Sequence, residues 1–460
     1  MGAIAFFLLS LSLFFSMGRA PLRAQGVPVP AAPEGASRAE AVVAETAPAA
    51  GLILTLERAW ELAEQNSVAL QKRALDLDLD RVKAKSLWAQ VFPSINISGG
   101  ANYTIPLNSN VKETDPSYTA RLSLSLGLSA GLPYTLANIS LAYKNGLLNY
   151  EQARRQLRFQ TSKTFYSLLA QKDSLLVLEG STRLAEEQLV RDRAARQNGY
   201  LGEVDFLSSS LSAERAKLSY TRALSEYRSA LGDFLAVLGL DRAGGTAGNA
   251  VLEGEVEISP LKLDPEALIA ARLPQRPSLA VQRNEVERLK NARMESFLSA
   301  KAPSLNFSAS LGASLAKGLD DTASAGVSVS IPIDPWIPRS QKDQAVRRAQ
   351  GEYEKALLDL RDMEDSARRE IRSYVENTAN AWREVEIARL QVSYAQRSFE
   401  LAEQGYRMGT MNFLNFETVR NRLTEARQQR LQSELNYQVL ILDLAASLDM
   451  DEAELRRFSE

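Results

Sequence analysis

The side chains of this 460-residue chain that could carry out chemistry are mainly carboxylates, because the chain contains no cysteine and no histidine. Their absence removes thiol nucleophiles, the imidazole general base and the usual zinc ligands. The 56 Asp and Glu residues form no recognisable acid constellation, and no glycine-rich phosphate-binding loop accompanies them. The sequence therefore predicts no enzyme, no cofactor and no metal site. The formal net charge of −2 likewise gives no electrostatic basis for binding nucleic acid.

The N-terminus resembles an export signal. Residues 3–15 form an apolar run that is too short to span a bilayer as a helix but fits the core of a secretory signal peptide, predicted to cover 1–24. The basic residues that usually precede such a core are missing, so an N-terminal membrane anchor is the alternative. Residues 25–50 are rich in Ala, Pro and Glu and predict a flexible leader. No later stretch contains 18 consecutive apolar residues, so any membrane entry would be through strands.

The rest of the chain is a duplication. The motif Pro93-Ser94-Ile95-Asn96 returns 210 positions later as Pro303-Ser304-Leu305-Asn306, and the same offset carries Gly199 to Gly409 and Tyr227 to Tyr437. Each copy predicts a helix, two strands and two long helices. The expected boundaries are repeat 1 at 51–240, a linker at 241–262, repeat 2 at 263–450 and a tail at 451–460.

Two predicted strand hairpins, 94–131 and 304–333, have the clearest period-two pattern in the chain. Their apolar residues alternate with Ser, Asn and Gly, and each strand reaches about 9–12 residues, the length of a tilted membrane strand. A soluble, half-buried sheet is the alternative, but the small and mostly uncharged polar face favours a water-filled lumen. Four strands cannot close a membrane barrel, and unpaired edges are not tolerated in lipid. Membrane strands would therefore require a homo-oligomer.

The helices are the largest predicted elements. Opening helices are expected at about 56–92 and 264–301, the second interrupted by Pro274 and Pro277, and long helices at about 136–198 and 340–408. Apolar residues recur at steps of three and four along both long helices, as in coiled coils. Charge runs such as Arg191-Asp192-Arg193 and Arg368-Arg369-Glu370 are interpreted as solvated faces.

Short glycine-containing breaks at 198–203 and 408–412 predict tight helix reversals, since glycine allows the left-handed backbone that ends a helix. Each tip could be a bare hairpin or an exposed surface that offers Tyr200, Leu201 and Met411 to a partner protein. The two copies differ just beyond the tips, where Asp205 in the first corresponds to Asn415 in the second.

With these parts in fixed order, the chain resembles the TolC-like outer-membrane efflux family over about residues 52–450. The resemblance rests on the opening segment 54–59, the Pro-Ser-(Ile/Leu)-Asn strand entries, both tips, and the helix endings at Leu238-Gly239 and Leu448. It implies a mainly α fold with membrane β structure, in which a homotrimer pools four strands per chain into a 12-stranded outer-membrane barrel and its helices form a periplasmic cylinder.

The resemblance also implies function. The chain would conduct substrates passively across the periplasm and outer membrane, in efflux or type I secretion, with a periplasmic adaptor and an inner-membrane transporter as partners. The implied adaptor-docking residues are Gly199, Tyr200, Leu201, Gly202, Gly409, Thr410 and Met411. Candidates for the periplasmic aperture, which family members often narrow with acidic residues, are Glu203, Asp205, Asn415, Glu417 and Thr418.

Asn415 and Thr418 depart from that acidic pattern, so a strong cation-attracting ring at Asn415 is not expected. The absence of cysteine also departs from lipidated members of the family. The alternatives are a periplasmic coiled-coil adaptor or scaffold, which usually carries one helical hairpin rather than two, and a carboxylate-dependent periplasmic hydrolase.

Overall fold

The computed structural model describes residues 53–103, 117–240, 251–254, 258–314 and 321–458. The predicted signal peptide and leader lie outside these residues, as does much of the predicted linker, and they stay predictions. None of the helices in the described residues combines the length and apolar composition that a membrane crossing requires.

The first copy begins with a broken helix. The sequence predicts one helix over 56–92, but the structure has α2 (Leu56–Asn66), α3 (Val68–Lys85) and a 3-10 turn, η1 (Leu87–Val91). The break has a local cause, because Ser67 adopts extended backbone and its hydroxyl accepts a hydrogen bond from the amide of Leu70, which starts a new helix. The strands β2 (Ser94–Asn102) and β3 (Ser117–Leu128) follow, then α4 (Leu132–Gln197) and α5 (Glu203–Val237).

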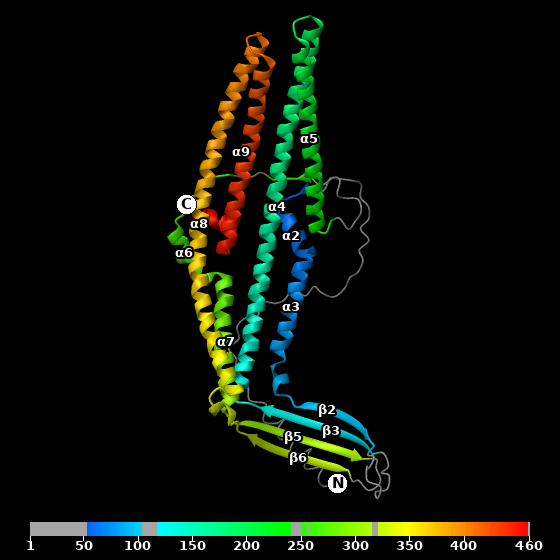
Figure 1. Ribbon diagram of the computed structural model, residues 1–460, viewed down its shortest axis with the longest axis vertical. Coiled ribbons are helices and arrows are strands. Elements are labelled where there is room, and N and C mark those ends of the chain that lie inside the picture. Colours follow the sequence, from blue (N-terminus) through cyan, green and yellow to red (C-terminus); the bar gives the residue numbers. More distant parts are fainter. Residues whose placement is uncertain (1–52, 104–116, 241–250, 255–257, 315–320, 459–460) are drawn as a thin grey trace. The chain divides into compact units, whose positions relative to one another are not determined.

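The second copy repeats this order (Figure 1). Its opening helix is interrupted near the two prolines as predicted, giving α6 (Pro265–Arg272), the turn η3 (Leu273–Gln275) and α7 (Pro277–Lys301). The remaining elements are β5 (Ser304–Ser314), β6 (Thr322–Ser330), the turn η4 (Asp334–Trp336), α8 (Gln341–Arg407), α9 (Phe413–Leu448) and α10 (Glu452–Arg457). The predicted tail thus contains a helix, α10, whose Leu455 is fully buried.

The four long strands form one antiparallel sheet in the order β2-β3-β5-β6, which leaves β2 and β6 as its edges. The register aligns polar residues across all four strands on one face, where serine hydroxyls meet at 2.6 Å between Ser94 and Ser125 and at 2.8 Å between Ser310 and Ser324. The opposite face carries Ile, Leu, Val and Phe, and Ile97 on it is 83% exposed. An uncovered apolar sheet face of this kind requires an apolar surrounding.

The buried core lies around the middle of the long helices, in two clusters that the duplication relates. In the first cluster Phe165 of α4 packs against Phe234 and Leu235 of α5 and against the short parallel pair β1 (Ile53–Leu54) and β4 (Val251–Leu252). In the second cluster Tyr437 is fully buried on α9, and its hydroxyl donates to the carbonyl of Ser259 at 2.8 Å. From this core α4 and α5 extend as one helical hairpin, and α8 and α9 as another (Figure 1).

Candidate functional site

Both hairpin tips are closed by the same backbone motif. Gly199 and Gly409 adopt φ of +77° and +71°, the left-handed region that glycine reaches without steric cost. In each tip the next amide donates back over the helix end, from Tyr200 to the carbonyl of Ala195 and from Thr410 to that of Gly405, both at 2.9 Å. This is the Schellman termination, and it turns the chain sharply enough to begin the returning helix within a few residues.

The first tip presents one large side chain to solvent. Tyr200 is 86% exposed, whereas Leu201 is partly buried. Gly202 is the N-cap of α5, and Glu203 in the first turn forms an ion pair with Arg196 at 2.6 Å. The Arg196 guanidinium also lies over the Phe206 ring, 4.6 Å from its centroid. An ion pair and a cation–π contact thus hold the two helix ends together, and the Tyr200 ring is exposed at the end of the tip.

The second tip differs in which side chain it exposes. Met411, predicted to face a partner, is partly buried against the cluster of Phe399, Ala402, Phe416 and Leu423. Met408 is 71% exposed instead, and the sequence prediction did not include it. Thr410 is exposed, but its hydroxyl donates to the carbonyl of Gly405 at 3.0 Å.

The five predicted aperture residues lie within the first two turns of α5 and α9. Asp205, Asn415 and Thr418 are exposed, and Glu417 is half-buried with its carboxylate 3.8 Å from Arg420. The amide of Asn415 is capped by the side chain of Asn412 at 2.9 Å. No hydrogen bond or ion pair joins these five to one another within the described residues, and no cluster of three acids there could hold a metal ion.

Behind the tips, the structure reveals a buried polar network that the sequence prediction missed. Asp192 of α4 is only 3% exposed, so its assignment to a solvated charge run was wrong. Its Oδ1 accepts hydrogen bonds from the Tyr406 hydroxyl at 3.0 Å and from Nε2 of Gln188 at 2.7 Å. The Tyr406 bond joins α4 to α8, and so joins the first hairpin to the second.

A buried arginine supplies a second link between the hairpins. Arg420 of α9 is 4% exposed, and its Nη2 donates to the hydroxyl of Ser212 on α5 at 2.6 Å. Burial lowers the pKa of Arg420, while the carboxylates of Glu417 and Asp192 oppose that shift. The Nε of Arg420 and the Oδ2 of Asp192 have no hydrogen-bond partner.

A signal for this network was present in the sequence. Ala185, Leu189 and Asp192 follow the three-and-four spacing of the α4 apolar seam, so Asp192 lies on the packed stripe. The duplication also indicates that Asp192 is buried. Its counterpart in the second copy, 210 positions later, is Ala402, which is 2% exposed. Position along the helix, rather than residue type, identifies Asp192 as buried.

Replacing Tyr406 by phenylalanine should weaken the contact between the hairpins by about 1–3 kcal/mol, because Asp192 then loses one of its two hydrogen bonds while staying buried. Tyr394→Phe is the matched control, since Tyr394 lies on the same helix and is 69% exposed. Thermal melting of the purified protein should show a lower Tm for Tyr406→Phe alone. Equal Tm values for the two variants would contradict this role of Tyr406.

The same tyrosine predicts an alkaline pH dependence. Burial, reinforced by the nearby Asp192 carboxylate, raises the pKa of Tyr406 above its ordinary value of 10.0. The raised pKa means that the folded state holds the phenolic proton more tightly. Its contribution to stability is therefore complete below pH 10.0 and is lost as pH rises through the raised pKa. Between pH 9 and pH 11, wild-type Tm should fall more than that of Tyr406→Phe.

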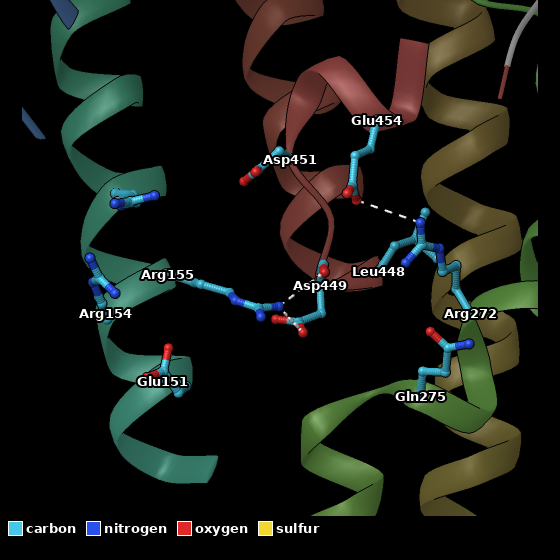
Figure 2. A pocket seen from close by; sticks show the side chains of 10 residues that line it. Glu151, Arg154, Arg155, Arg272, Gln275, Leu448, Asp449, Asp451 and Glu454 are labelled. Carbon is cyan, nitrogen blue, oxygen red and sulfur yellow. Dashed lines mark hydrogen bonds and ion pairs between the residues drawn. The ribbon is translucent and has the colours of Figure 1, made fainter. Parts of the chain in front are cut away.

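A polar cleft of about 530 Å³ lies where the two copies meet near the core. Figure 2 shows Arg155 of α4 directed at Asp449, and Arg272 of α6 directed at Glu454, with which it pairs at 3.5 Å. Arg154 pairs with Glu64 at 2.8 Å. Because these arginines already have carboxylate partners, the cleft is best described as a set of ion pairs that connects α4, α6 and the C-terminal segment.

The chain matches the family model described as outer membrane efflux protein over residues 59–240 and 268–448, one match for each copy. In fold it is similar to the CmeC outer membrane channel of Campylobacter jejuni, with 18% identity, coverage of 88% of this chain and 89% of that chain, and a TM-score of 0.72. It is also similar to the outer membrane protein VceC of Vibrio cholerae, with 14% identity, 85% and 95% coverage and a TM-score of 0.68.

The open state of the Neisseria gonorrhoeae MtrE outer membrane channel is a third similar structure, with 15% identity, 88% and 90% coverage and a TM-score of 0.67. No curated protein matches the chain in sequence. The family match and the duplicated fold favour a channel over the adaptor alternative, and they confirm the predicted mainly helical architecture, in which two strand hairpins form one four-stranded sheet. The chain belongs to the outer membrane efflux protein family, and it is an outer-membrane channel whose helices extend into the periplasm.

Proposed function

We propose that three copies of this chain form a passive efflux duct in which the sheets close one 12-stranded outer-membrane barrel and the helices enclose a periplasmic tunnel. A periplasmic adaptor docks at the hairpin tips and connects the duct to an inner-membrane transporter, which supplies the energy. The duct itself requires no catalytic step, and the carboxylate hydrolase alternative has no acid cluster in its favour among the described residues.

The observation that carries this proposal is the open four-stranded sheet. Its edges, β2 and β6, have unpaired backbone groups, and its apolar face is uncovered. The apolar face suits the lipid of a bilayer. The unpaired edges are tolerable there only if the β6 edge of one copy pairs with the β2 edge of another.

The number of copies follows from the strand count. Two copies would give eight strands, and side chains fill the interior of an eight-stranded barrel. Three copies give twelve strands, which leave an open lumen and agree with the arrangement that the family resemblance implies. The small residues of the polar face suit such a lumen, because they leave its centre free.

The mass of the detergent-solubilised protein tests the proposal. Light scattering corrected for bound detergent should give three times the chain mass, because the sheet edges are satisfied only in the closed assembly. A monomeric or dimeric mass in a mild detergent that preserves the fold would refute the pooled barrel.

The proposed docking role of the tips is tested at Tyr200. Replacing Tyr200 by aspartate should reduce export about tenfold or more, since an exposed aromatic anchor at an interface commonly contributes about 2 kcal/mol. The readout is accumulation of a fluorescent dye that the wild-type chain exports, in cells whose only copy is the variant. Tyr394→Asp is the control, because Tyr394 is similarly exposed but lies on the body of α8. Wild-type export by a correctly assembled Tyr200→Asp variant would contradict the docking role.

A further inference from the structure

Arg121 is the one charged residue within the four strands β2, β3, β5 and β6. Residues on its face of β3 alternate with the leucines of the apolar face, so Arg121 shares its side with Thr119, Ser123 and Ser125. Apart from Arg121, this polar face consists only of Ser, Thr, Asn and Gly in all four strands. Arg121 is therefore the one source of formal charge on the polar face of these four strands.

The residues that face Arg121 across the sheet are small and uncharged. The register places Ser98 of β2 and Gly312 of β5 directly beside it, and Thr322 of β6 beyond Gly312. None of these three carries charge. Asp321, which precedes Thr322, lines the same shallow pocket as Arg121, but no hydrogen bond or ion pair joins Arg121 to Asp321 or to any other described residue. Arg121 is solvent-exposed, and a guanidinium stays protonated at any physiological pH.

The apolar face fixes the direction of Arg121 in a membrane barrel. Ile97 and Leu122, on the opposite face at the neighbouring level, must face lipid, so Arg121 faces the lumen. Arginine is also the longest side chain on that face. Side chains fill the interior of an eight-stranded barrel, whereas a sixteen-stranded barrel encloses a water-filled channel. A 12-stranded barrel is intermediate in width, so the length of a side chain in its lumen strongly affects the cross-section left open to solutes.

We propose that three Arg121 side chains form a cationic ring that narrows the strand section of the lumen and favours anionic over cationic solutes. This inference rests on the proposed trimer. β3 starts at Ser117, at the end of the sheet remote from the helices, and Arg121 lies four residues, or about 13 Å along the strand, from that start. The ring therefore lies in the half of the sheet that is remote from the helices. The charge selectivity of the duct is thus set partly in the sheet, at a distance from the hairpin tips.

The natural absence of cysteine allows the local potential to be measured directly. Ser98→Cys introduces one thiol per chain, beside Arg121 and on the same face. In the full-length protein in lipid vesicles, the rates of modification by an anionic and a cationic methanethiosulfonate reagent are compared. Their ratio cancels effects on thiol reactivity itself, because both reagents attack the same thiolate.

Adding Arg121→Ser should lower the anionic-to-cationic rate ratio at Ser98→Cys by about twofold or more at an ionic strength of about 0.1 M, where the Debye length is about 10 Å. Adding Arg121→Lys should preserve the ratio, since the charge remains. Ser328→Cys is the matched control on the same face, six residues along the sheet register and therefore about 20 Å away, beyond the Debye length. Its ratio should change little.

An unchanged ratio at Ser98→Cys after Arg121→Ser would overturn the ring, and so would an equal change at Ser328→Cys. The proposed barrel is judged by a separate variant, Leu122→Cys, on the apolar face. If its thiol reacts with these water-soluble reagents as fast as Ser98→Cys does, the barrel is wrong and the ring falls with it. Slow reaction at Leu122→Cys with an unchanged Ser98→Cys ratio would reject the ring alone.

Discussion

Replacing Leu124 by arginine should prevent the chain from assembling in the outer membrane. Leu124 lies near the middle of β3 on the apolar face, paired with Ile95 and Ala309. An arginine facing lipid at the centre of a barrel strand costs about 2–4 kcal/mol, and three copies would raise the cost to roughly 6–12 kcal/mol for each trimer. That is comparable with the whole stability of a typical folded domain. The expected result is loss of the oligomer from the outer-membrane fraction.

The control is the residue next to it. Ser125→Arg places the same side chain on the polar face, beside Ser94 and Ser308, where water would solvate it. This variant should assemble at close to the wild-type level. Light scattering of detergent extracts measures the amount of trimer for both variants. Equal loss of trimer in the two would contradict the assignment of the apolar face to lipid and of the polar face to water.

Replacing Gly239 by alanine should destabilise the fold by about 2–5 kcal/mol, through left-handed strain of about 1–2 kcal/mol and overpacking of about 1–3 kcal/mol. Gly239 ends the second hairpin helix of the first copy with φ of +77°. A Cβ there would lie 2.6 Å from Cγ of Asn66. It would displace the side chain whose Nδ2 donates to the carbonyl of Leu238 at 2.8 Å.

Gly199→Ala separates the two causes. Gly199 has the same φ, but a Cβ added there would meet no atom within 4 Å. This variant should therefore lose only the strain energy, about 1–2 kcal/mol. Thermal melting should place Gly199→Ala between wild type and Gly239→Ala. Equal Tm values for the two variants would show that the clash with Asn66 does not contribute to the loss of stability.

The strands and long helices could be predicted from the sequence because their signals are local. Period-two alternation placed all four strands, and the absence of proline and paucity of glycine placed α4 and α8 within a few residues of their observed ends. The break in the second opening helix could also be predicted, because Pro274 and Pro277 mark it in the sequence. The break at Ser67 in the first copy escaped prediction, because no proline marks it and a serine inside a helix is common.

What escaped prediction at the candidate site depends on contacts between distant segments. The helix spacing marks Asp192 as buried, but its hydrogen-bond partner Tyr406 is known only once the fold brings α8 against α4. Met411 looks exposed until α8 and α9 pack together and form the apolar cluster against which it lies. Asp449 adopts a left-handed backbone, with φ of +56°, at the position 210 residues after Gly239. Gly239 and Asp449 both end a helix with left-handed backbone. Their residue types differ, so this shared role is apparent only from the structure.

The two open sheet edges also have a genetic consequence. If the duct is a trimer, each chain must supply one edge to each neighbour, so a chain with a damaged β6 edge disables two intact partners. In a cell that makes intact and damaged chains equally, random mixing leaves only about one-eighth of the trimers fully intact. Alleles altered at β2 or β6 should therefore be dominant over the normal allele, whereas alleles that prevent folding altogether should be recessive.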